Sequence, residues 1–199
     1  GTILRIHPDG TGMQRFASGI RNTVGFDWDP HTGDLWFTDN GRDNLGDDLP
    51  PDELNHAASA GMNFGFPAYY GNCMVNPEYS YRVHSADCTP RSLELPAHVA
   101  TLGMRFYTGT LFPEEYRDAI FIAEHGSWNR KTPIGYQVVT VKMANGSVAS
   151  PAVPFATGFL GADGTVHGRP VDIEVLPDGS ILVSDDYSGR LYRISYQGS

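Results

Sequence analysis

Short stretches rich in apolar residues run along this chain, some of them with apolar and polar residues alternating, and clusters of turn residues separate them. Residues 24–28 and 35–38 form one pair of such stretches around a turn at residues 30–33. The alternation at residues 24–28 and the short apolar run at residues 35–38 predict β-strands, and the short polar segment between them predicts a hairpin. Two further pairs repeat the pattern: residues 103–106 with 119–124, and residues 171–175 with 181–185.

The three hairpins share the way they end and the strand that follows. Each second strand closes on an acidic residue before a glycine-containing loop, and these residues are Asp39, Glu124 and Asp185. Matching outer strands are predicted at residues 2–6, 137–141 and 190–194. Repeats of strands every 40–50 residues or so are typical of β-propeller blades, so we predict an all-β chain with about three blades. A small β-sandwich is the alternative.

One long insertion, at about residues 55–101, interrupts the repeat. Its start, Asn55 to Gly61, predicts one helical turn ended by glycine, and residues 63–76 predict a packed, aromatic surface loop. Cys73 and Cys88 lie in this insertion, which has little core of its own. A disulfide between them would stabilise the loop and imply export, whereas two buried free thiols are the alternative.

Composition narrows the class of protein. Of 199 residues, 40% are apolar and only 19% are charged, which indicates a folded globular chain. Many glycines and prolines, with 12% aromatic residues, favour an all-β fold. The net charge of −9 argues against nucleic acid binding, because no basic stripe could replace phosphate counterions. No apolar run in the sequence is long enough to span a bilayer.

Polar motifs gather near the ends of the predicted strands. Arg21 and Asn22 precede the first hairpin, and Arg169 has the same place before the third. A loop rich in glycine and acids follows the first hairpin, with Asp39, Gly41, Asp43, Gly46, Asp47, Asp48, Asp52 and Glu53. Loops on a rigid β-scaffold commonly carry binding groups. The sequence therefore predicts a binding site at this rim.

Several short motifs resemble one enzyme family in their order and spacing. They are Gly19-Ile20-Arg21-Asn22, Thr38-Asp39-Asn40-Gly41, Asp52-Glu53-Leu54-Asn55, Gly61-Met62-Asn63-Phe64-Gly65-Phe66-Pro67 and Ala123-Glu124-His125-Gly126-Ser127-Trp128-Asn129-Arg130. The family is that of the quinoprotein glucose/sorbosone dehydrogenases, which use pyrroloquinoline quinone (PQQ). The resemblance covers nearly the whole chain and implies the C-terminal half of a six-bladed β-propeller. It further implies PQQ over the central channel and Ca²⁺ polarising the quinone.

The resemblance implies that Arg21 and Asn22 bind PQQ near its reactive carbonyls. A guanidinium offers a planar fork of donors to a carboxylate or quinone oxygen, and a carboxamide offers a neutral donor. An ion pair between Arg21 and an acid such as Asp39, holding the blade together, is the alternative.

Two further basic positions are expected to meet PQQ. Arg169 precedes its strand as Arg21 does, so both should reach the same rim. Arg130, or its neighbour Lys131, would bind a PQQ carboxylate from the loop after the second hairpin. Val171 stands where family members often carry a second arginine, so one contact is missing or supplied otherwise. His125, in the Arg130 loop, is equally interpreted as a packed, hydrogen-bonded histidine.

The metal is expected on backbone oxygens. The resemblance implies that the carbonyls of Gly41 and Arg42 bind Ca²⁺, which accepts oxygen ligands in flexible geometry. Arg42 replaces the proline common in the family, a change that backbone ligation tolerates. Four acids would bind a further structural Ca²⁺ or form a solvated acidic loop: Asp47, Asp48, Asp52 and Glu53.

No catalytic base is assigned in this chain. Sugar oxidation needs a group that removes the proton of the C1 hydroxyl, and a histidine near neutrality does this well. In the family that histidine lies upstream of all the residues here. The remaining histidines are interpreted as loop or rim residues without a partner pattern: His7, His31, His56, His84, His98 and His167.

The resemblance therefore implies a PQQ-dependent oxidoreductase for an aldose or sorbosone-type sugar, with a separate electron acceptor. The upstream half of the propeller would be its partner, so residues 1–199 are expected to form a partial propeller domain that does not turn over alone. A calcium-dependent, lactonase-type propeller hydrolase using Asp39, Glu124 and Asp185 is one alternative. A non-catalytic propeller that binds a partner is another. The expected disulfide favours a periplasmic or secreted location.

Overall fold

A computed structural model describes residues 1–83 and 88–198. Its elements, in chain order, are β1 (Thr2–Arg5), β2 (Gln14–Ser18), β3 (Phe26–Trp28), β4 (Leu35–Asp39), β5 (Asp52–Ala57), β6 (Met62–Asn63), β7 (Tyr69–Tyr70), β8 (Met74–Val75), the 3-10 helix η1 (Pro77–Arg82), β9 (Leu93–Leu95), β10 (Thr101–Phe106), η2 (Glu114–Tyr116), β11 (Ile120–Glu124), β12 (Gln137–Val141), β13 (Met143–Ala144), β14 (Ser147–Val148), β15 (Val153–Ala156), β16 (Pro170–Val175), β17 (Ile181–Asp185) and β18 (Arg190–Ile194).

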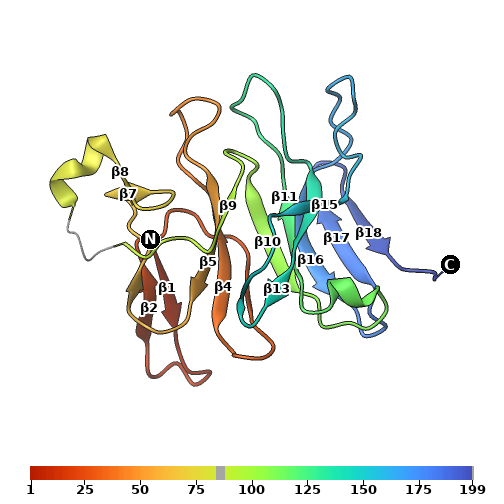
Figure 1. The fold of residues 1–199 in the computed structure, drawn as a ribbon, viewed down its shortest axis with the longest axis horizontal. Helices are drawn as coiled ribbons and strands as arrows, with labels where there is room; N and C mark the ends of the chain where they lie inside the picture. The colour runs from red at the N-terminus through yellow and green to blue at the C-terminus, as the bar shows by residue number, and fades with distance from the viewer. Residues whose placement is uncertain (84–87, 199) are drawn as a thin grey trace.

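The larger sheets follow one another across the molecule in chain order (Figure 1). They are β1-β2-β6, β3-β4-β5-β9, β10-β11-β12-β15 and β16-β17-β18, which we call blades 1 to 4. Sequence neighbours within each blade pair antiparallel, and only β6 joins its neighbour β2 in parallel among the described strands. In blades 2 and 3 the outermost strands, β9 and β15, lead into β10 and β16, the first strands of the blades that follow. The structure therefore confirms the all-β prediction and the three repeated hairpins.

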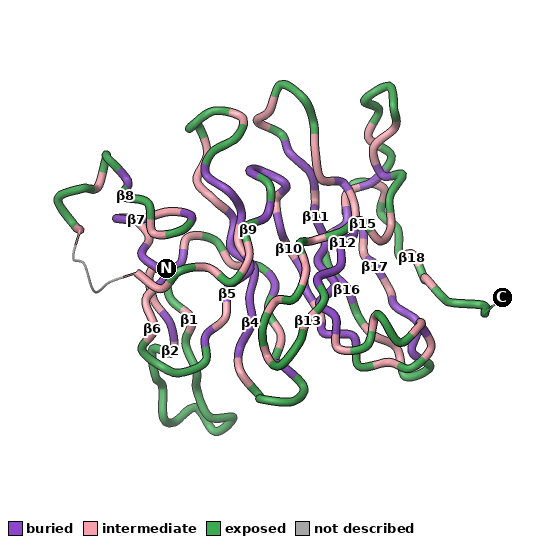
Figure 2. Tube along the Cα trace, viewed as in Figure 1, coloured by how far each residue is buried: buried purple, intermediate pink, exposed green. Residues whose placement is uncertain are grey.

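Strand β11 shows why these sequences stack as blades. All five of its residues are buried, and its side chains alternate between two faces. Ile120 and Ile122 pack into the core between blades 2 and 3, against Trp36. Phe121 and Ala123 pack into the core between blades 3 and 4. Figure 2 shows the buried segments running through the strands, with exposed loops at their ends. Because β11 serves two cores, truncating Phe121 to alanine would cost about 3–5 kcal/mol.

A third core joins blade 1 to blade 2. Leu35 and Phe37 of β4 face this core, whereas Trp36 between them faces the opposite one. Phe64, from the segment after β6, packs edge-on against Phe37 with ring centroids 5.0 Å apart. The rim of blade 2 that carries Arg21 is thereby supported from both sides.

The predicted helical turn at residues 55–61 is wrong. Residues Asn55 to Ala57 belong to β5 and pair with residues 35–37 of β4. His56 stacks on Trp36, with ring centroids 4.4 Å apart, and its Nε2 lies 2.9 Å from an Asp34 carboxylate oxygen. Cross-strand pairing and burial override the local helical preference here. His56 is thus a partnered strand residue, which corrects its interpretation as a loop histidine.

The disulfide prediction is confirmed. Cys73 and Cys88 are bonded, with Cα atoms 5.8 Å apart. They lie in the segment between β5 and β9, two strands that pair with each other in blade 2. The bond therefore closes a loop that leaves the blade and returns to it.

Candidate functional site

The Arg21–Asn22 pair is held in place by the buried carboxylate at the end of β4. Asp39 accepts hydrogen bonds from the backbone N–H groups of Arg21, at 2.9 Å, and of Asn22, at 2.6 Å. Burial raises the pKa of Asp39 to about 6, although the two N–H groups and the charge of Arg21 oppose this shift. Asp39 thus fixes the backbone of the pair and leaves both side chains available.

The guanidinium of Arg21 points along the rim of the blades. It donates to the carbonyl oxygen of Asn40 at 3.1 Å and forms an ion pair with Asp43 at 3.0 Å. The expected alternative, an ion pair with an acid that holds the blade, is therefore present with Asp43, while Asp39 binds the backbone. Asn129 Nδ2 donates to the other Asp43 oxygen at 2.9 Å, which links the rims of blades 2 and 3.

Blade 4 repeats this design around Arg169. The N–H group of Arg169 donates to Asp185, at the end of β17, over 3.0 Å. Its guanidinium donates to the carbonyl oxygens of His125 at 3.0 Å and Gly126 at 2.6 Å, and lies 5.2 Å from the ring centre of Tyr136. Arg169 is therefore oriented by the loop of the preceding blade.

These rims enclose a polar cavity of about 300 Å³. Two arginines, two acids and two histidines contribute to its wall, together with Trp128 and several backbone segments. Its lining residues are Arg21, Asn22, Asn40, Gly41, Asp43, Asp52, His98, Ala100, Leu102, His125, Gly126, Trp128, Asn129 and Arg169. The structure thus brings together four of the residues singled out from the sequence: Arg21, Asn22, Gly41 and Arg169.

Arg42 and Arg130 face elsewhere. The Arg42 guanidinium donates to Asn76 at 3.2 Å and Glu78 at 2.8 Å, beside a small cavity of about 20 Å³ that Gly41 also lines. Arg130 donates to the carbonyl oxygens of Asp47 and Ala97 and to the carboxylate of Asp48. The sequence placed Arg130 against a cofactor, but its donors are used to hold two loops together and it does not line the polar cavity.

The four acids proposed for a structural Ca²⁺ do not gather at one point. Asp52 is buried and accepts from the N–H groups of Gly41 and Ala100, both at 2.8 Å. Burial raises the pKa of Asp52 to about 6, against these hydrogen bonds. Asp48 meets Arg130 at the surface, and Asp47 accepts from the Lys131 N–H group. Within residues 1–83 and 88–198, no cluster of three or more acids, histidines or cysteines could hold a metal ion.

Several histidines have partners that the sequence did not suggest. His98 lines the cavity, buried and at positive φ, with Nε2 2.8 Å from the Gly46 carbonyl and Nδ1 3.3 Å from Asn129 Nδ2. Because a carbonyl only accepts, Nε2 carries the proton and Nδ1 accepts. His125 lies 2.8 Å from Asp186. His98 precedes β10 much as Arg21 precedes β3. This shared position before the first strand of a blade is the sequence signal that could have indicated His98 as a cavity residue. His84 lies outside the described residues.

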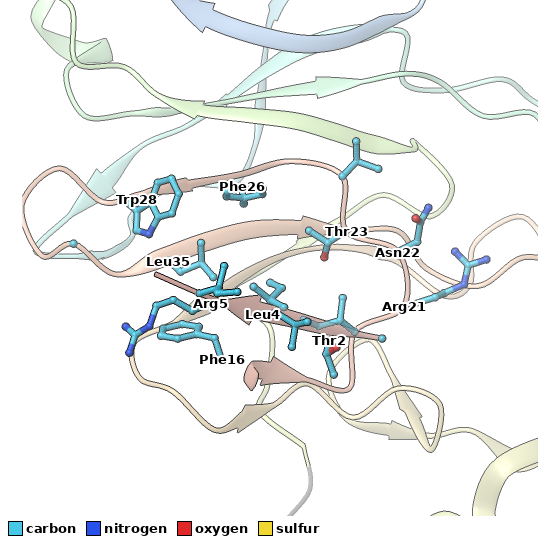
Figure 3. A pocket seen from close by; sticks show the side chains of 16 residues that line it. Thr2, Leu4, Arg5, Phe16, Arg21, Asn22, Thr23, Phe26, Trp28 and Leu35 are labelled. Atoms are coloured by element: carbon cyan, nitrogen blue, oxygen red, sulfur yellow. The ribbon is translucent and has the colours of Figure 1, made fainter. Parts of the chain in front are cut away.

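A second, larger cavity of about 650 Å³ lies between β1 and the β3–β4 hairpin. Figure 3 shows Leu4, Phe26, Trp28 and Leu35 around it, with Arg21 and Asn22 at the end away from Trp28. Among the described strands, β1 pairs only with β2, so its edge along this cavity has no partner. The wall is mostly apolar, and its Arg21–Asn22 pair is shared with the polar cavity, which also gathers Arg169, Asp43 and Asp52. The polar cavity is therefore the better candidate for a cofactor.

Comparison with known proteins identifies the family to which this chain belongs. The family model for glucose/sorbosone dehydrogenase matches residues 1–129, which include Arg21, Asn22 and the whole acidic loop. The chain belongs to the glucose/sorbosone dehydrogenase family. A second family model, described as TrAA12-like, matches residues 78–197. Solved structures of related enzymes superpose on the blades seen here. The fold is therefore the predicted quinoprotein-type β-propeller, of which this chain forms a part.

Individual proteins are similar to this glucose/sorbosone dehydrogenase family member in sequence or in structure. An uncharacterised protein of Borreliella burgdorferi is 45% identical over 98% of this chain and 52% of its own length. The PQQ-dependent pyranose dehydrogenase of Coprinopsis cinerea is 31% identical over 55% of this chain and 17% of its length. A structure of the Trichoderma reesei carbohydrate-active enzyme of family AA12 superposes with a TM-score of 0.75 and 25% identity, covering 88% of this chain and 52% of that one.

The chain therefore spans about half the length of the first of these relatives. The same holds for the superposed structure. The described part of the chain contains no helix that is long and apolar enough to cross a membrane.

Proposed function

We propose that this chain forms part of the site of a PQQ-dependent dehydrogenase that oxidises an aldose or sorbosone-type sugar. The observation that supports this most is the convergence of Arg21 and Arg169, from different blades, on one polar cavity that Asn22 also lines. PQQ carries three carboxylates and an ortho-quinone, and guanidinium groups bind such oxygens by paired hydrogen bonds. The donor set therefore fits this cofactor.

The acidic side of the same cavity fits a divalent cation. Asp43 and Asp52 line it next to Gly41. A Cβ at Gly41 would lie 2.7 Å from the Pro51 carbonyl oxygen, so the loop needs glycine to follow this path. We propose that the carbonyl oxygens of Gly41 and Arg42 bind Ca²⁺, in keeping with its preference for oxygen ligands. When bound, PQQ with Ca²⁺ supplies the hydride acceptor for sugar oxidation.

The chain itself contributes orientation. Asp39 and Asp185 fix the backbone of Arg21 and Arg169, and the guanidinium groups are held by neighbouring carbonyls before any ligand arrives. Such preorganisation reduces the entropy lost on binding. Arg130 acts as a loop anchor in this proposal rather than as a cofactor residue.

The proposed partners are a sugar substrate and a separate electron acceptor. The name of the Coprinopsis relative supports a pyranose as the substrate. We propose that further strands complete blade 1 along the free edge of β1 and that this upstream half supplies the general base. The disulfide supports a periplasmic or secreted location.

The lactonase alternative finds no support in the geometry. Asp39 and Asp185 bind backbone N–H groups of their own blades, and Glu124 accepts from Gln137 at 2.8 Å. Among the described residues these three carboxylates do not form a metal-binding group.

The test is to add PQQ and Ca²⁺ to the purified chain and to follow both quinone absorbance and reduction of a dye by an aldose. The proposal expects PQQ binding that chelation of Ca²⁺ reverses, with little turnover. Turnover on the order of 1–10³ per second would place the general base within this chain. Absence of PQQ binding, with hydrolysis of a lactone in Ca²⁺ alone, would overturn the proposal in favour of a hydrolase.

A further inference from the structure

Trp128 stands out among the residues of the polar cavity because it is large, apolar and 70% exposed. The other two tryptophans have aromatic neighbours. Trp28 packs edge-on against Phe26 at 5.5 Å, and Trp36 is buried between His56 and Phe106. Exposing an indole costs hydrophobic free energy, so a tryptophan at the edge of a cavity commonly marks a binding contact.

The loop that carries Trp128 is anchored on both sides of it. Before it, Ser127 is buried; its N–H donates to the Ile134 carbonyl at 2.9 Å, and its hydroxyl accepts from the Ile134 N–H at 3.0 Å. The Tyr136 hydroxyl also donates to the Ser127 carbonyl. After it, Asn129 donates to Asp43 at 2.9 Å. The backbone on both sides of Trp128 is therefore held in place, so little backbone conformational entropy would be lost on binding.

We propose that the indole of Trp128 is the surface on which the pyranose ring of the substrate stacks, which makes Trp128 a specificity-determining residue. The inference rests on the proposed function and adds the recognition of the ring form of the sugar. One face of a pyranose presents C–H groups, which pack on the face of an aromatic ring, while its hydroxyls need polar partners. Trp128 supplies the apolar face, and Asn22, Asp43 and Arg21 line the same cavity with polar groups.

The kinetic test compares variants of the complete, PQQ- and Ca²⁺-loaded enzyme with D-glucose as substrate. Trp128→Ala should raise KM about tenfold or more, while kcat changes by less than about threefold. Trp128→Phe should lie between this variant and the parent because it keeps a smaller ring. Tyr187→Ala is the matched control, since Tyr187 is also an exposed aromatic, 61% exposed, but does not line the cavity. Its KM should stay unchanged.

A second measurement needs no turnover. In a Trp28→Phe background, only the buried Trp36 and the exposed Trp128 fluoresce on excitation of tryptophan. Titration of residues 1–199 with D-glucose should shift or quench the emission, whereas the acyclic polyol D-glucitol should not. Further replacement of Trp128 by Phe should abolish the glucose response.

An unchanged KM in Trp128→Ala, or an equal response to glucose and glucitol, would overturn the inference. A chain that binds no PQQ would instead refute the proposed function, and the fluorescence titration would then decide the role of Trp128 by itself.

Discussion

Asp39 and Asp185 have equivalent places in different blades, but their pKa values are shifted in opposite directions. Each ends the second strand of its hairpin, and each accepts the N–H group of the arginine that precedes the first strand. Burial raises the pKa of Asp39 to about 6. Burial would also raise the pKa of Asp185, but hydrogen bonds from Ser188, Arg169 and Tyr192 lower it to about 2.

Asp185 accepts more hydrogen bonds than Asp39 does. Asp39 accepts from two backbone N–H groups. Asp185 accepts from three, those of Arg169, Tyr187 and Ser188, and from the hydroxyls of Ser188 at 2.6 Å and Tyr192 at 3.2 Å. Donors favour the ionised form of a carboxylate, whereas burial disfavours it.

The difference shows that one backbone design can serve two purposes. Ionised Asp185 stabilises blade 4 as well as placing Arg169. Ionised Asp39 places Arg21 and Asn22 but lowers the stability of the folded chain at neutral pH. The carboxylate whose ionised form burial disfavours, Asp39, therefore lies at the Arg21 rim of the cavity, which we associate with binding.

The largest effect is expected from Asp185→Ala. This change leaves three backbone N–H groups and two hydroxyls without their acceptor, so the free energy of unfolding should fall by about 3–5 kcal/mol at pH 7. Urea denaturation would measure it. The neighbouring Asp186→Ala removes an exposed partner of His125 and should cost less than about 1 kcal/mol. Equal losses in the two variants would contradict the network drawn around Asp185.

The next effect is a pair of opposite pH dependences. Asp185 has a lowered pKa in the folded chain, so its stabilisation is present above the unfolded pKa of 3.8 and declines as pH falls toward 2. Asp185→Asn should therefore cost about 2 kcal/mol at pH 7 and about 1 kcal/mol at pH 3.

Asp39 should behave in the opposite way. Its folded pKa lies above 3.8, so stability is lost as pH rises from about 4 to 6. Asp39→Asn removes that titration and should cost less at pH 7 than at pH 4. Denaturation midpoints of both variants and the parent between pH 3 and 7 would show the two slopes. Slopes of the same sign would remove the contrast between the blades.

A smaller effect should come from Ser188→Ala. The variant removes the shortest hydrogen bond to Asp185, so the pKa of that carboxyl should rise toward 3.8 and the chain should lose about 1–2 kcal/mol. Tyr192→Phe, which removes a longer bond of 3.2 Å, should cost less. NMR titration of the Asp185 carboxyl carbon would follow the pKa in each variant. An unaltered titration in Ser188→Ala would rule out the hydroxyl as the source of the low pKa.

Local patterns were sufficient to predict much of the fold. Short apolar or alternating stretches around a polar turn located the three hairpins, and β4 and β11 are buried throughout because each packs against a neighbouring blade on both faces. The same periodicity could not reveal that Asn55 to Ala57 pair with β4, since that pairing depends on Trp36 and on a register fixed in three dimensions. Cysteine placement was enough for the disulfide because the insertion lacks a core.

The sequence placed Arg21 and Arg169 at a common rim because both precede the first strand of a hairpin. Arg21 and Arg169 precede equivalent strands, and both line the polar cavity. Arg130 does not line this cavity because its guanidinium donates to distant partners, the carbonyl oxygens of Asp47 and Ala97, which no local pattern indicates. His98 was overlooked although its place before β10 resembles that of Arg21 before β3; its partners Gly46 and Asn129 come from other loops.

The central claim is that two blades direct Arg21 and Arg169 into one cofactor cavity. The most direct test is to measure the binding of PQQ to three arginine variants. In the presence of Ca²⁺, Arg21→Gln and Arg169→Gln should each raise the Kd for PQQ roughly 10- to 100-fold, as expected for the loss of a charged hydrogen bond. Arg130→Gln should bind PQQ as the parent does, because Arg130 lies outside the cavity lining. Parent-like binding by Arg21→Gln and Arg169→Gln, or weakened binding by Arg130→Gln alone, would contradict the account.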